Sequence, residues 1–513
     1  MKPLLIPEIG LRLLLLITVF VSFFLNIHSV PLFDLDEGAF SEATREMLVR
    51  GDYISTYLNG VPRYDKPILI YWLQAASVSV LGINELAFRL PSALFSTLWV
   101  YLIYYFVKRV KDSETALLAA FIMASSLQVS IIARAAIADA TLNFFITGSM
   151  FSIYLFYLNG EKKYIYLSFA AIALGFLTKG PIAVLIPLVV SFIFFLMKGR
   201  LTLWLRTIFN PYGILIFVLL AAPWYIAQYL KEGQAFIDGF FLKHNLERFN
   251  SPLQHHSGSM LYYLPVLLIG ILPYTSAFLR VLTRIKDVIK DDLQVYLGIW
   301  IIFVIVFFSF AQTKLHHYIV YGYPAVFILM SFYISTLRSR LLALLPQAIL
   351  FASLLLVPMF IASQASTSTD PFLRTILLSA GDYFSFSYQL FFGFALVLTL
   401  YFMLEKKIAL AHKLLLSGTV TVLGLSIFIV PLAGQLLQQP IKDAALIAKQ
   451  ANYKVIMWDL NTPSFNVYTR RLVEKREPRA GDIVITKSKN LQRLKSFDTL
   501  YLKNGIALVK VTQ

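Results

Sequence analysis

Long apolar segments recur along most of the chain, and they constrain its fold more than any other feature. Of the 513 residues, 58% are hydrophobic and 14% are charged, whereas about a quarter of a typical soluble domain is charged. Because a run of about 20 apolar residues can cross a bilayer as a helix, the pattern predicts an α-helical polytopic membrane protein with about 13 spans. Their approximate centres are residues 20, 97, 123, 148, 171, 189, 220, 271, 302, 327, 352, 393 and 422.

Basic residues occur in every second loop between these segments, beginning with Lys2 and Arg12 at the N-terminus. The further basic loops on this side are 108–111, 162–163, 198–200, 284–290, 338–340 and 406–407. Because basic loops tend to stay in the cytoplasm, we expect a cytoplasmic N-terminus in a bacterial inner (plasma) membrane. Contact of these loops with anionic lipid explains the net charge of +17, and we expect no nucleic-acid partner.

The loops on the opposite side carry carboxylates, histidines and isolated lysines that contact with lipid does not explain. These loops are 31–66, 132–139, 178–181, 231–260 and 312–317. An odd number of spans places the polar tail on that side too, and its strand-like runs at Lys454–Leu460, Asp482–Thr486 and Ile506–Val511 predict a small α/β domain. We therefore expect a membrane domain, 1–439, with periplasmic loops 31–85 and 231–260, and a small periplasmic domain, 440–513.

The first loop on that side begins with three acids, Asp34, Asp36 and Glu37, ahead of an amphipathic helix. This helix has apolar residues such as Phe40 on one side and polar residues such as Glu42 on the other, which predicts that it lies along the membrane surface. One carboxylate would be enough to cap the helix. Three acids together therefore indicate a chemical role for at least one of them.

The same loop ends with Asp65, Lys66 and Pro67, directly before an apolar helix that carries Tyr71 and Trp72. Proline suits the first turn of a helix, and the two aromatic residues suit the membrane interface. Lys66 is then expected at the depth of the lipid headgroups. Its ammonium group could be a snorkelling anchor or the partner of a lipid phosphate, and the residues alone leave both interpretations open.

Further motifs follow in order along the chain, and they carry a resemblance to a known class. The motifs are Asp36-Glu37-Gly38 with Arg45-Glu46-Met47, Lys66-Pro67 with Tyr71-Trp72, Asp139 after Arg134, Thr178-Lys179-Gly180-Pro181, Asn245-Leu246-Glu247-Arg248 with His256, Tyr262-Tyr263 with Pro265 and Pro273, and Lys314-Leu315-His316-His317-Tyr318 with Pro324. Taken together they resemble the GT-C membrane glycosyltransferases. The resemblance is greatest to the bacterial aminoarabinose transferases that act on lipid A, and more distant to the protein O-mannosyltransferases. It covers most of the chain.

The resemblance implies a GT-C fold, a sugar donor carried on polyprenyl (undecaprenyl) phosphate, and an inverting transfer at the exported face. Fixed cations would meet the charge of the phosphate leaving group, and the matching residues are Lys66, Lys179, Lys314 and Arg248. The candidate catalytic acids are Asp36, Asp139 and Glu37. A hydroxyl acceptor would need one of them as a base, whereas for an ionised phosphate acceptor an aspartate would orient the donor sugar.

The resemblance also suggests a divalent cation, zinc, between Asp65 and His256. The chain departs from the family at three places. Ala39-Phe40 stands where the family has Arg-Tyr, Asp65 stands where it has Glu, and Gly258-Ser259-Met260-Leu261 replaces an aromatic run. These departures bear on the identity of the sugar and the acceptor more than on the class of reaction.

The resemblance leads us to expect transfer of 4-amino-4-deoxy-L-arabinose, or a similar amino sugar, to a lipid A phosphate on the periplasmic side by a monomeric enzyme. One alternative is a polyprenyl-phosphate-hexose-dependent transferase that acts on a protein or an envelope glycan. The alternative from another class is a lipid or glycan transporter or flippase. A transporter would carry ionisable residues inside its spans, whereas here they gather in the loops of one side.

Overall fold

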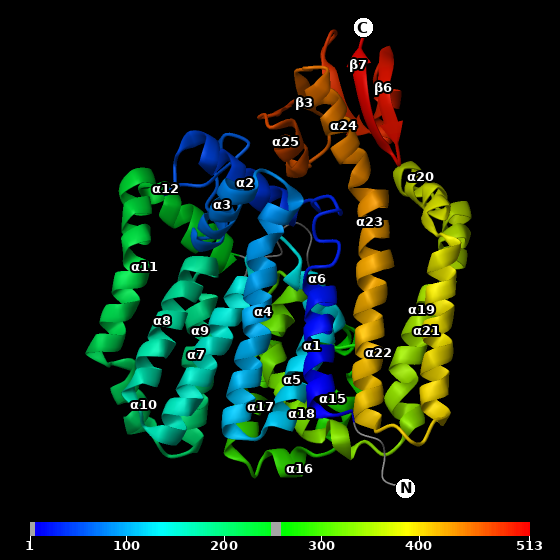
Figure 1. Cartoon of the computed structure of the whole chain (residues 1–513). Coiled ribbons are helices and arrows are strands. Elements are labelled where there is room, and N and C mark those ends of the chain that lie inside the picture. Colours follow the sequence, from blue (N-terminus) through cyan, green and yellow to red (C-terminus); the bar gives the residue numbers. More distant parts are fainter. Residues whose placement is uncertain (1–5, 248–257) are drawn as a thin grey trace.

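The computed structural model describes residues 6–247 and 258–513, which form a bundle of helices with a small sheet at one end (Figure 1). The helices of the bundle are α1 (Glu8–Phe23), α4 (Glu85–Val110), α5 (Ser113–Ser125), α6 (Leu127–Ala133), α7 (Asp139–Asn159), α8 (Lys162–Lys179), α9 (Ile182–Met197), α11 (Pro211–Glu232), α14 (Tyr263–Gly270), α15 (Thr275–Leu282), α17 (Asp292–Phe310), η2 (His316–Gly322), α18 (Tyr323–Tyr333), η3 (Ile334–Thr336), α19 (Arg340–Thr367), α21 (Phe386–Leu404), α22 (Leu410–Gly424), η5 (Leu425–Ile429) and α23 (Val430–Leu437).

Shorter elements lie at the two ends of this bundle (Figure 1). They are α2 (Asp36–Arg50), β1 (Tyr57–Leu58), β2 (Val61–Pro62), α3 (Leu69–Leu81), α10 (Leu201–Ile208), α12 (Gln234–Phe236), η1 (Ile237–Glu247), α16 (Ile285–Val288), α20 (Pro371–Ala380) and η4 (Gly381–Tyr383). Polar side chains start many of the helices by accepting a hydrogen bond from a backbone N–H of the first turn. The residues that do so are Asn84, Asp112, Asn210, Asp291, Ser339, Asp370 and Ser385.

Eight helical segments in the described ranges are long and apolar enough to cross a membrane, or nine if α5 and α6, bent by 68°, form one broken span. The chain is therefore a multi-pass helical membrane protein, as expected. The expected number of about 13 spans is larger, because several of the apolar segments fold as short or charged helices. Helices α1 and α9 have 16 residues each, α14 and α15 have 8 each, and α8 contains three lysines.

The C-terminal region forms a mixed sheet of five strands that helices accompany. Its elements are α24 (Gln439–Gln450), β3 (Val455–Met457), α25 (Pro463–Thr469), β4 (Glu474–Lys475), β5 (Ile483–Lys487), η6 (Ser488–Arg493), β6 (Phe497–Lys503) and β7 (Ile506–Val511). The strand order is β4-β3-β5-β7-β6, with β3 parallel to both its neighbours and β7 antiparallel to β5 and β6. This small mixed sheet confirms the predicted α/β character of the tail, whereas β4 and β6 were not expected.

Helix α25 packs against α2, and this contact corrects one expectation about the first loop. The polar face of α2 was expected to meet water at the membrane surface, but Glu42, Arg45 and Glu46 are buried there. Arg45 donates two hydrogen bonds to Glu42, of 2.6 and 2.7 Å, and Glu46 accepts from the backbone N–H of Gly60. Pairing of this kind is what allows charged side chains to be buried.

Asp34 provides the closest link between the first loop and the C-terminal region. Its carboxylate accepts a hydrogen bond of 2.9 Å from the backbone N–H of Ser464 and a second from the hydroxyl of the same residue. Burial raises the pKa of Asp34 to about 7, although both hydrogen bonds oppose this shift. Gly38 permits the approach, because a Cβ atom there would lie 2.7 Å from the backbone nitrogen of Ser464. The sheet is thereby held over the end of the bundle that carries α2 and α3 (Figure 1).

Candidate functional site

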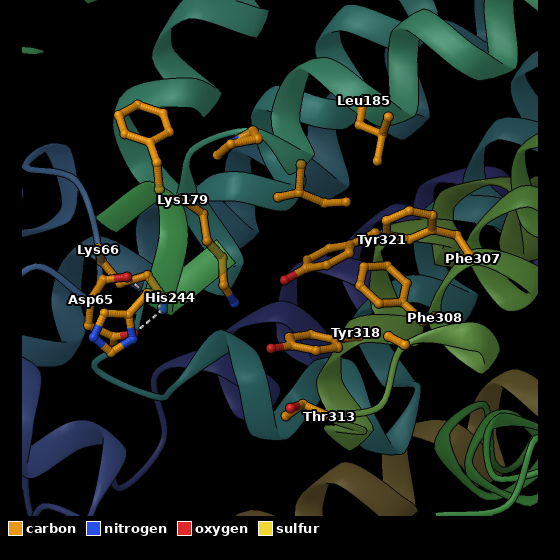
Figure 2. Close-up of a pocket in the computed structure, with 14 residues that line it drawn as sticks. Asp65, Lys66, Lys179, Leu185, His244, Phe307, Phe308, Thr313, Tyr318 and Tyr321 are labelled. Carbon is orange, nitrogen blue, oxygen red and sulfur yellow. Dashed lines mark hydrogen bonds and ion pairs between the residues drawn. The ribbon is translucent and has the colours of Figure 1, made fainter. Parts of the chain in front are cut away.

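A cavity of about 430 Å³ lies between four segments that are distant in the sequence. Its polar residues come from the loop before α3, the end of α8, η1 and η2, while α9 and α17 supply apolar side chains. Figure 2 shows Lys179 extending between the Asp65 and His244 side of this cavity and the rings of Tyr318 and Tyr321. The cavity therefore has charged groups on one part of its wall and apolar groups on another.

The turn between α8 and α9 places Lys179 in the cavity. Lys179 is the last residue of α8, and Gly180 follows with a φ of +82° before Pro181 starts the next helix. A glycine is required there for two reasons: its φ is positive, and a Cβ atom would lie 2.6 Å from the ring of Phe240. Lys179 also suits this place electrostatically, because a cation is favourable at the negative end of a helix dipole.

Asp139 is the partner of Lys179. Its Oδ1 lies 2.7 Å from the Lys179 Nζ, and it accepts a hydrogen bond of 3.1 Å from the hydroxyl of Tyr321. Asp139 is 3% exposed and the Lys179 side chain 9% exposed. The Lys179 ammonium lies 5.6 Å from the ring centroids of both Tyr318 and Tyr321, within range of a cation–π interaction. Three segments of the chain thus hold one buried cation.

Lys66 stands on the other side of the same cavity, in a second charged group. Its Nζ donates hydrogen bonds to the Asp65 carboxylate at 2.9 Å and to the Asp65 carbonyl oxygen at 3.0 Å. The other carboxylate oxygen accepts from Arg63 at 3.1 Å. The Nδ1 atom of His244, on η1, lies 3.2 Å from the Asp65 carboxylate. Asp65 thus orients Lys66 while Arg63 orients Asp65, and His244 contacts the same carboxylate without a hydrogen bond.

Asp36 does not line this cavity but an adjacent one of about 380 Å³, together with Asp34, Glu37, His316 and His317. Asp36 is exposed and has no hydrogen-bond or ion-pair partner in the part of the chain that the structure describes. Asp139 lines neither cavity but contacts a residue of each. Its carboxylate binds Lys179, which lines the first cavity, and lies 3.9 Å from the Nε2 atom of His317, which lines the second.

The chain is similar to several known proteins. Residues 65–226, which include Asp65, Lys66, Asp139 and Lys179, match the family model described as dolichyl-phosphate-mannose-protein mannosyltransferase. An uncharacterized protein of Aquifex aeolicus is 35% identical over 318 residues, which are 62% of this chain and 71% of that protein. The undecaprenyl phosphate-alpha-4-amino-4-deoxy-L-arabinose arabinosyl transferase of Aeromonas hydrophila is 33% identical over 61% of this chain.

The chain belongs to the GT-C class of membrane glycosyltransferases, whose sugar donors are lipid phosphates. It spans 58% of the length of the Aeromonas relative. The crystal structure of ArnT from Cupriavidus metallidurans bound to undecaprenyl phosphate has the same fold, with a TM-score of 0.80 at 19% identity over 98% of this chain and 97% of that one. The expected GT-C fold and the expected class of enzyme are thereby confirmed.

Two of the predicted site residues, Glu37 and Lys314, do not line the cavity that holds Lys66 and Lys179, and each has several hydrogen-bond partners. The Glu37 carboxylate accepts four hydrogen bonds: two from Arg89, of 2.6 and 2.8 Å, and two from backbone N–H groups, those of Phe33 and Ala136. These four bonds hold the first loop against α4, and a catalytic role for Glu37, which lines the second cavity, stays a prediction. Lys314 donates to the carbonyl oxygens of Ser309 and Ala311, at the end of α17. It does not line the cavity of Lys66 and Lys179.

The sequence prediction missed two polar residues of the cavity that Lys66 and Lys179 line, namely His244 and Tyr321. His244 directly precedes the recognised motif Asn245-Leu246-Glu247-Arg248, so its place next to that motif was the available signal. Tyr321 follows Tyr318 by three residues in η2, a 3₁₀ helix, where positions three apart lie on one face. The remaining two predicted residues, Arg248 and His256, lie outside the described residues.

The zinc predicted between Asp65 and His256 involves one residue, His256, that lies outside the described ranges. Structural zinc has four protein ligands and catalytic zinc usually three, but no group of three or more His, Asp or Glu side chains in residues 6–247 and 258–513 is placed to bind a metal. The Asp65 carboxylate is also in contact with Lys66 and Arg63, two cations that would repel a metal ion. The pairing of Asp65 with His256 stays a prediction, and no step of the reaction is assigned to a metal.

Replacing one member of the Asp139–Lys179 pair in the GT-C enzyme should destabilise it more than replacing both. Asp139→Asn or Lys179→Met leaves the other charge buried without its partner, which costs about 3–5 kcal/mol. The double variant Asp139→Leu/Lys179→Met removes both charges and should recover most of that loss. Chemical unfolding in detergent measures the coupling between the two sites.

Glu161→Gln is the matched control, because its ion pairs with Arg109 and Lys163 join side chains that are all more than a third exposed. We expect this variant to unfold like the unmodified enzyme. Single variants at 139 and 179 that are as stable as this control would contradict the buried pair.

Proposed function

We propose that the chain transfers a sugar from polyprenyl phosphate to an acceptor in the cell envelope, and that the cavity holding Lys66 and Lys179 binds the donor. The strongest support is that one part of the cavity wall is charged and another part is apolar. Two lysines from separate segments face the space, while Ile182, Leu185 and Phe307 line another part of it. A donor of this kind needs both, because its phosphate is anionic and its prenyl chain is apolar.

The chemistry of the leaving group suits these two cations. When the bond between the anomeric carbon and the phosphate oxygen breaks, negative charge grows on the phosphate. Lysine ammonium groups fixed at that oxygen stabilise the charge in the transition state. Each ammonium has three N–H donors, so Lys179 can keep its bond to Asp139 while it donates to the phosphate. Lys66, held by Asp65, adds a second positive charge from another segment of the cavity wall. Attack from the opposite face of the sugar then inverts the anomeric carbon.

The two aspartates have different parts in this scheme. Asp139 is engaged by Lys179 and Tyr321, so its role is to hold Lys179 toward the donor. Asp36 is exposed in the second cavity and can accept a proton from an acceptor hydroxyl. For an acceptor that is already an ionised phosphate no base is needed, and Asp36 would then bind hydroxyl or amino groups of the sugar.

For the donor and acceptor we propose 4-amino-4-deoxy-L-arabinose, or a similar amino sugar, and a lipid A phosphate. The support is the similarity to the Aeromonas arabinosyl transferase. The second candidate is transfer of a hexose to a hydroxyl group of a protein or envelope glycan, and the exposed carboxylate of Asp36 favours it. The transporter and flippase alternatives lose their support with the assignment to the GT-C class.

Lys66→Ala and Lys179→Ala should each lower transfer by about 100- to 1,000-fold, the usual loss when one fixed donor to a developing anion is removed. The measurement is mass spectrometry of lipid A and of the glycoprotein fraction from cells that lack the gene and carry each variant. Lys163→Ala, an exposed lysine paired with Glu161 at the other end of the bundle, is the control and should keep full transfer.

The same spectra separate the acceptors. A pentosamine-sized mass on lipid A that needs Lys66 supports the first choice. A mass change confined to the glycoprotein fraction would show that the acceptor is not lipid A, and it would support the second candidate. Full transfer by well-folded Lys66→Ala and Lys179→Ala enzymes would remove both residues from the mechanism.

We also propose that the cavities and the C-terminal sheet face the periplasm from the inner membrane, as the basic loops indicate. Because the chain has no cysteine, single cysteines report on orientation without background. In intact spheroplasts an impermeant maleimide should label Lys489→Cys, on η6, and should label Lys286→Cys, on α16, only after the membrane is opened. Both positions are exposed. The reverse pattern would place the site in the cytoplasm.

A further inference from the structure

A third cavity, of about 530 Å³ and with a polar wall, lies far from the proposed donor site. Its wall is built where α19 and α22 begin and α21 ends, at the end of the bundle that carries the N-terminus in Figure 1. Cationic and polar residues on this wall include Arg338, Arg340, Lys406 and His412, and the acidic residue is Glu114. Three cations against one acid predict that the cavity attracts an anion.

Two of these cations are available for a ligand. Arg338 and Lys406 are exposed, and neither has a hydrogen-bond or ion-pair partner within residues 6–247 and 258–513. Arg340 is partly engaged, because its Nη1 donates to the backbone carbonyl oxygen of Glu405 at 2.6 Å. The Glu405 carboxylate itself is bound by Lys413 at 3.0 Å and so does not neutralise Arg338 or Lys406.

His412 adds a buried donor to the same wall. It is 4% exposed, and its Nδ1 accepts a hydrogen bond of 3.1 Å from the backbone N–H of Ile6. A neutral imidazole that accepts at Nδ1 carries its proton on Nε2, and this N–H has no partner in the described part of the chain. Helix α22 also begins at the cavity with Ala409 as its N-cap, which has no side-chain oxygen to cap the first N–H groups.

The surroundings of the cavity point to a lipid as the source of the anion. Leu341 and Leu342, beside Arg340 on α19, are 58% and 68% exposed, and Leu404, at the end of α21, is 74% exposed. In a multi-pass membrane protein such side chains face acyl chains. The cations of the cavity are therefore next to the lipid-facing surface, at the depth where lipid phosphates lie.

We propose that this cavity binds the phosphate headgroup of an anionic phospholipid, with its acyl chains along the exposed leucines of α19 and α21. Arg338 and Lys406 contact the phosphate, and His412 donates to it from the cavity wall. The lipid joins α19 to α22 at the end of the bundle opposite the C-terminal sheet. This site is independent of the sugar that the enzyme transfers.

The test is titration of the purified full-length protein in detergent with phosphatidylglycerol, followed by native mass spectrometry. Arg338→Ala/Lys406→Ala should weaken binding by about 25-fold, the loss expected when two cations near an anionic lipid are removed. Arg338→Lys/Lys406→Arg keeps both charges and should bind within a few-fold of the unmodified protein.

The matched control is Lys286→Ala/Lys290→Ala, which removes two exposed cations from α16 and the turn after it, outside this cavity. It should leave the binding of phosphatidylglycerol unchanged. Equal losses in the control and in the Arg338/Lys406 variant would overturn the proposal, because they would show a diffuse charge effect. Phosphatidylcholine that binds as tightly, or inorganic phosphate that displaces the lipid at equal concentration, would overturn it too.

Discussion

The buried ion pair between Asp139 and Lys179 is the interaction on which the proposed donor site depends. It joins the first residue of α7 to the last residue of α8, two helices that pack closely along their length. Tyr321 donates to the same carboxylate and His317 lies beside it, so η2 is tied to this pair as well. A lysine held in this way keeps one position when the donor arrives, and fixed charges stabilise a transition state without first having to move.

The two cavities next to the Asp139–Lys179 pair differ in the charged groups that they contain. The first cavity contains Lys66 and Lys179, each close to an aspartate, and the second contains the exposed Asp36. The bidentate contact of Glu37 with Arg89 fixes the loop that carries Asp36, and the hydrogen bonds between Asp34 and Ser464 bring the C-terminal region onto it. The C-terminal sheet therefore contributes to the site by fixing the first loop, as a positioning element.

Much of the site could be predicted from the sequence, because loops on one side of a membrane must meet at one surface. This reasoning placed Lys66, Lys179 and Asp139 at one face. The structure brings Lys66 and Lys179 to one cavity, and Asp139 is buried beside it as the partner of Lys179. It could not distinguish Glu37 from Asp36, since Arg89 and the N–H of Ala136 are 52 and 99 residues from Glu37 in the sequence. The buried polar face of α2 was unpredictable for the same reason: its cover, α25, comes more than 400 residues later. Only eight or nine of the expected 13 spans are long and apolar enough in the described residues to cross a membrane, because hydropathy does not show where an apolar segment breaks into short helices.

The central claim is that Lys66 and Lys179 bind one phosphate together, and affinity for undecaprenyl phosphate tests it most directly. The measurement is the dissociation constant of the unmodified enzyme, of Lys66→Met, of Lys179→Met and of the double variant, with Lys489→Met as the control. We expect each single change to weaken binding by about tenfold or more, as for one charge-assisted hydrogen bond. The two effects should not be additive, because both cations contact one ligand. An unchanged affinity in the double variant would contradict a donor phosphate in this cavity.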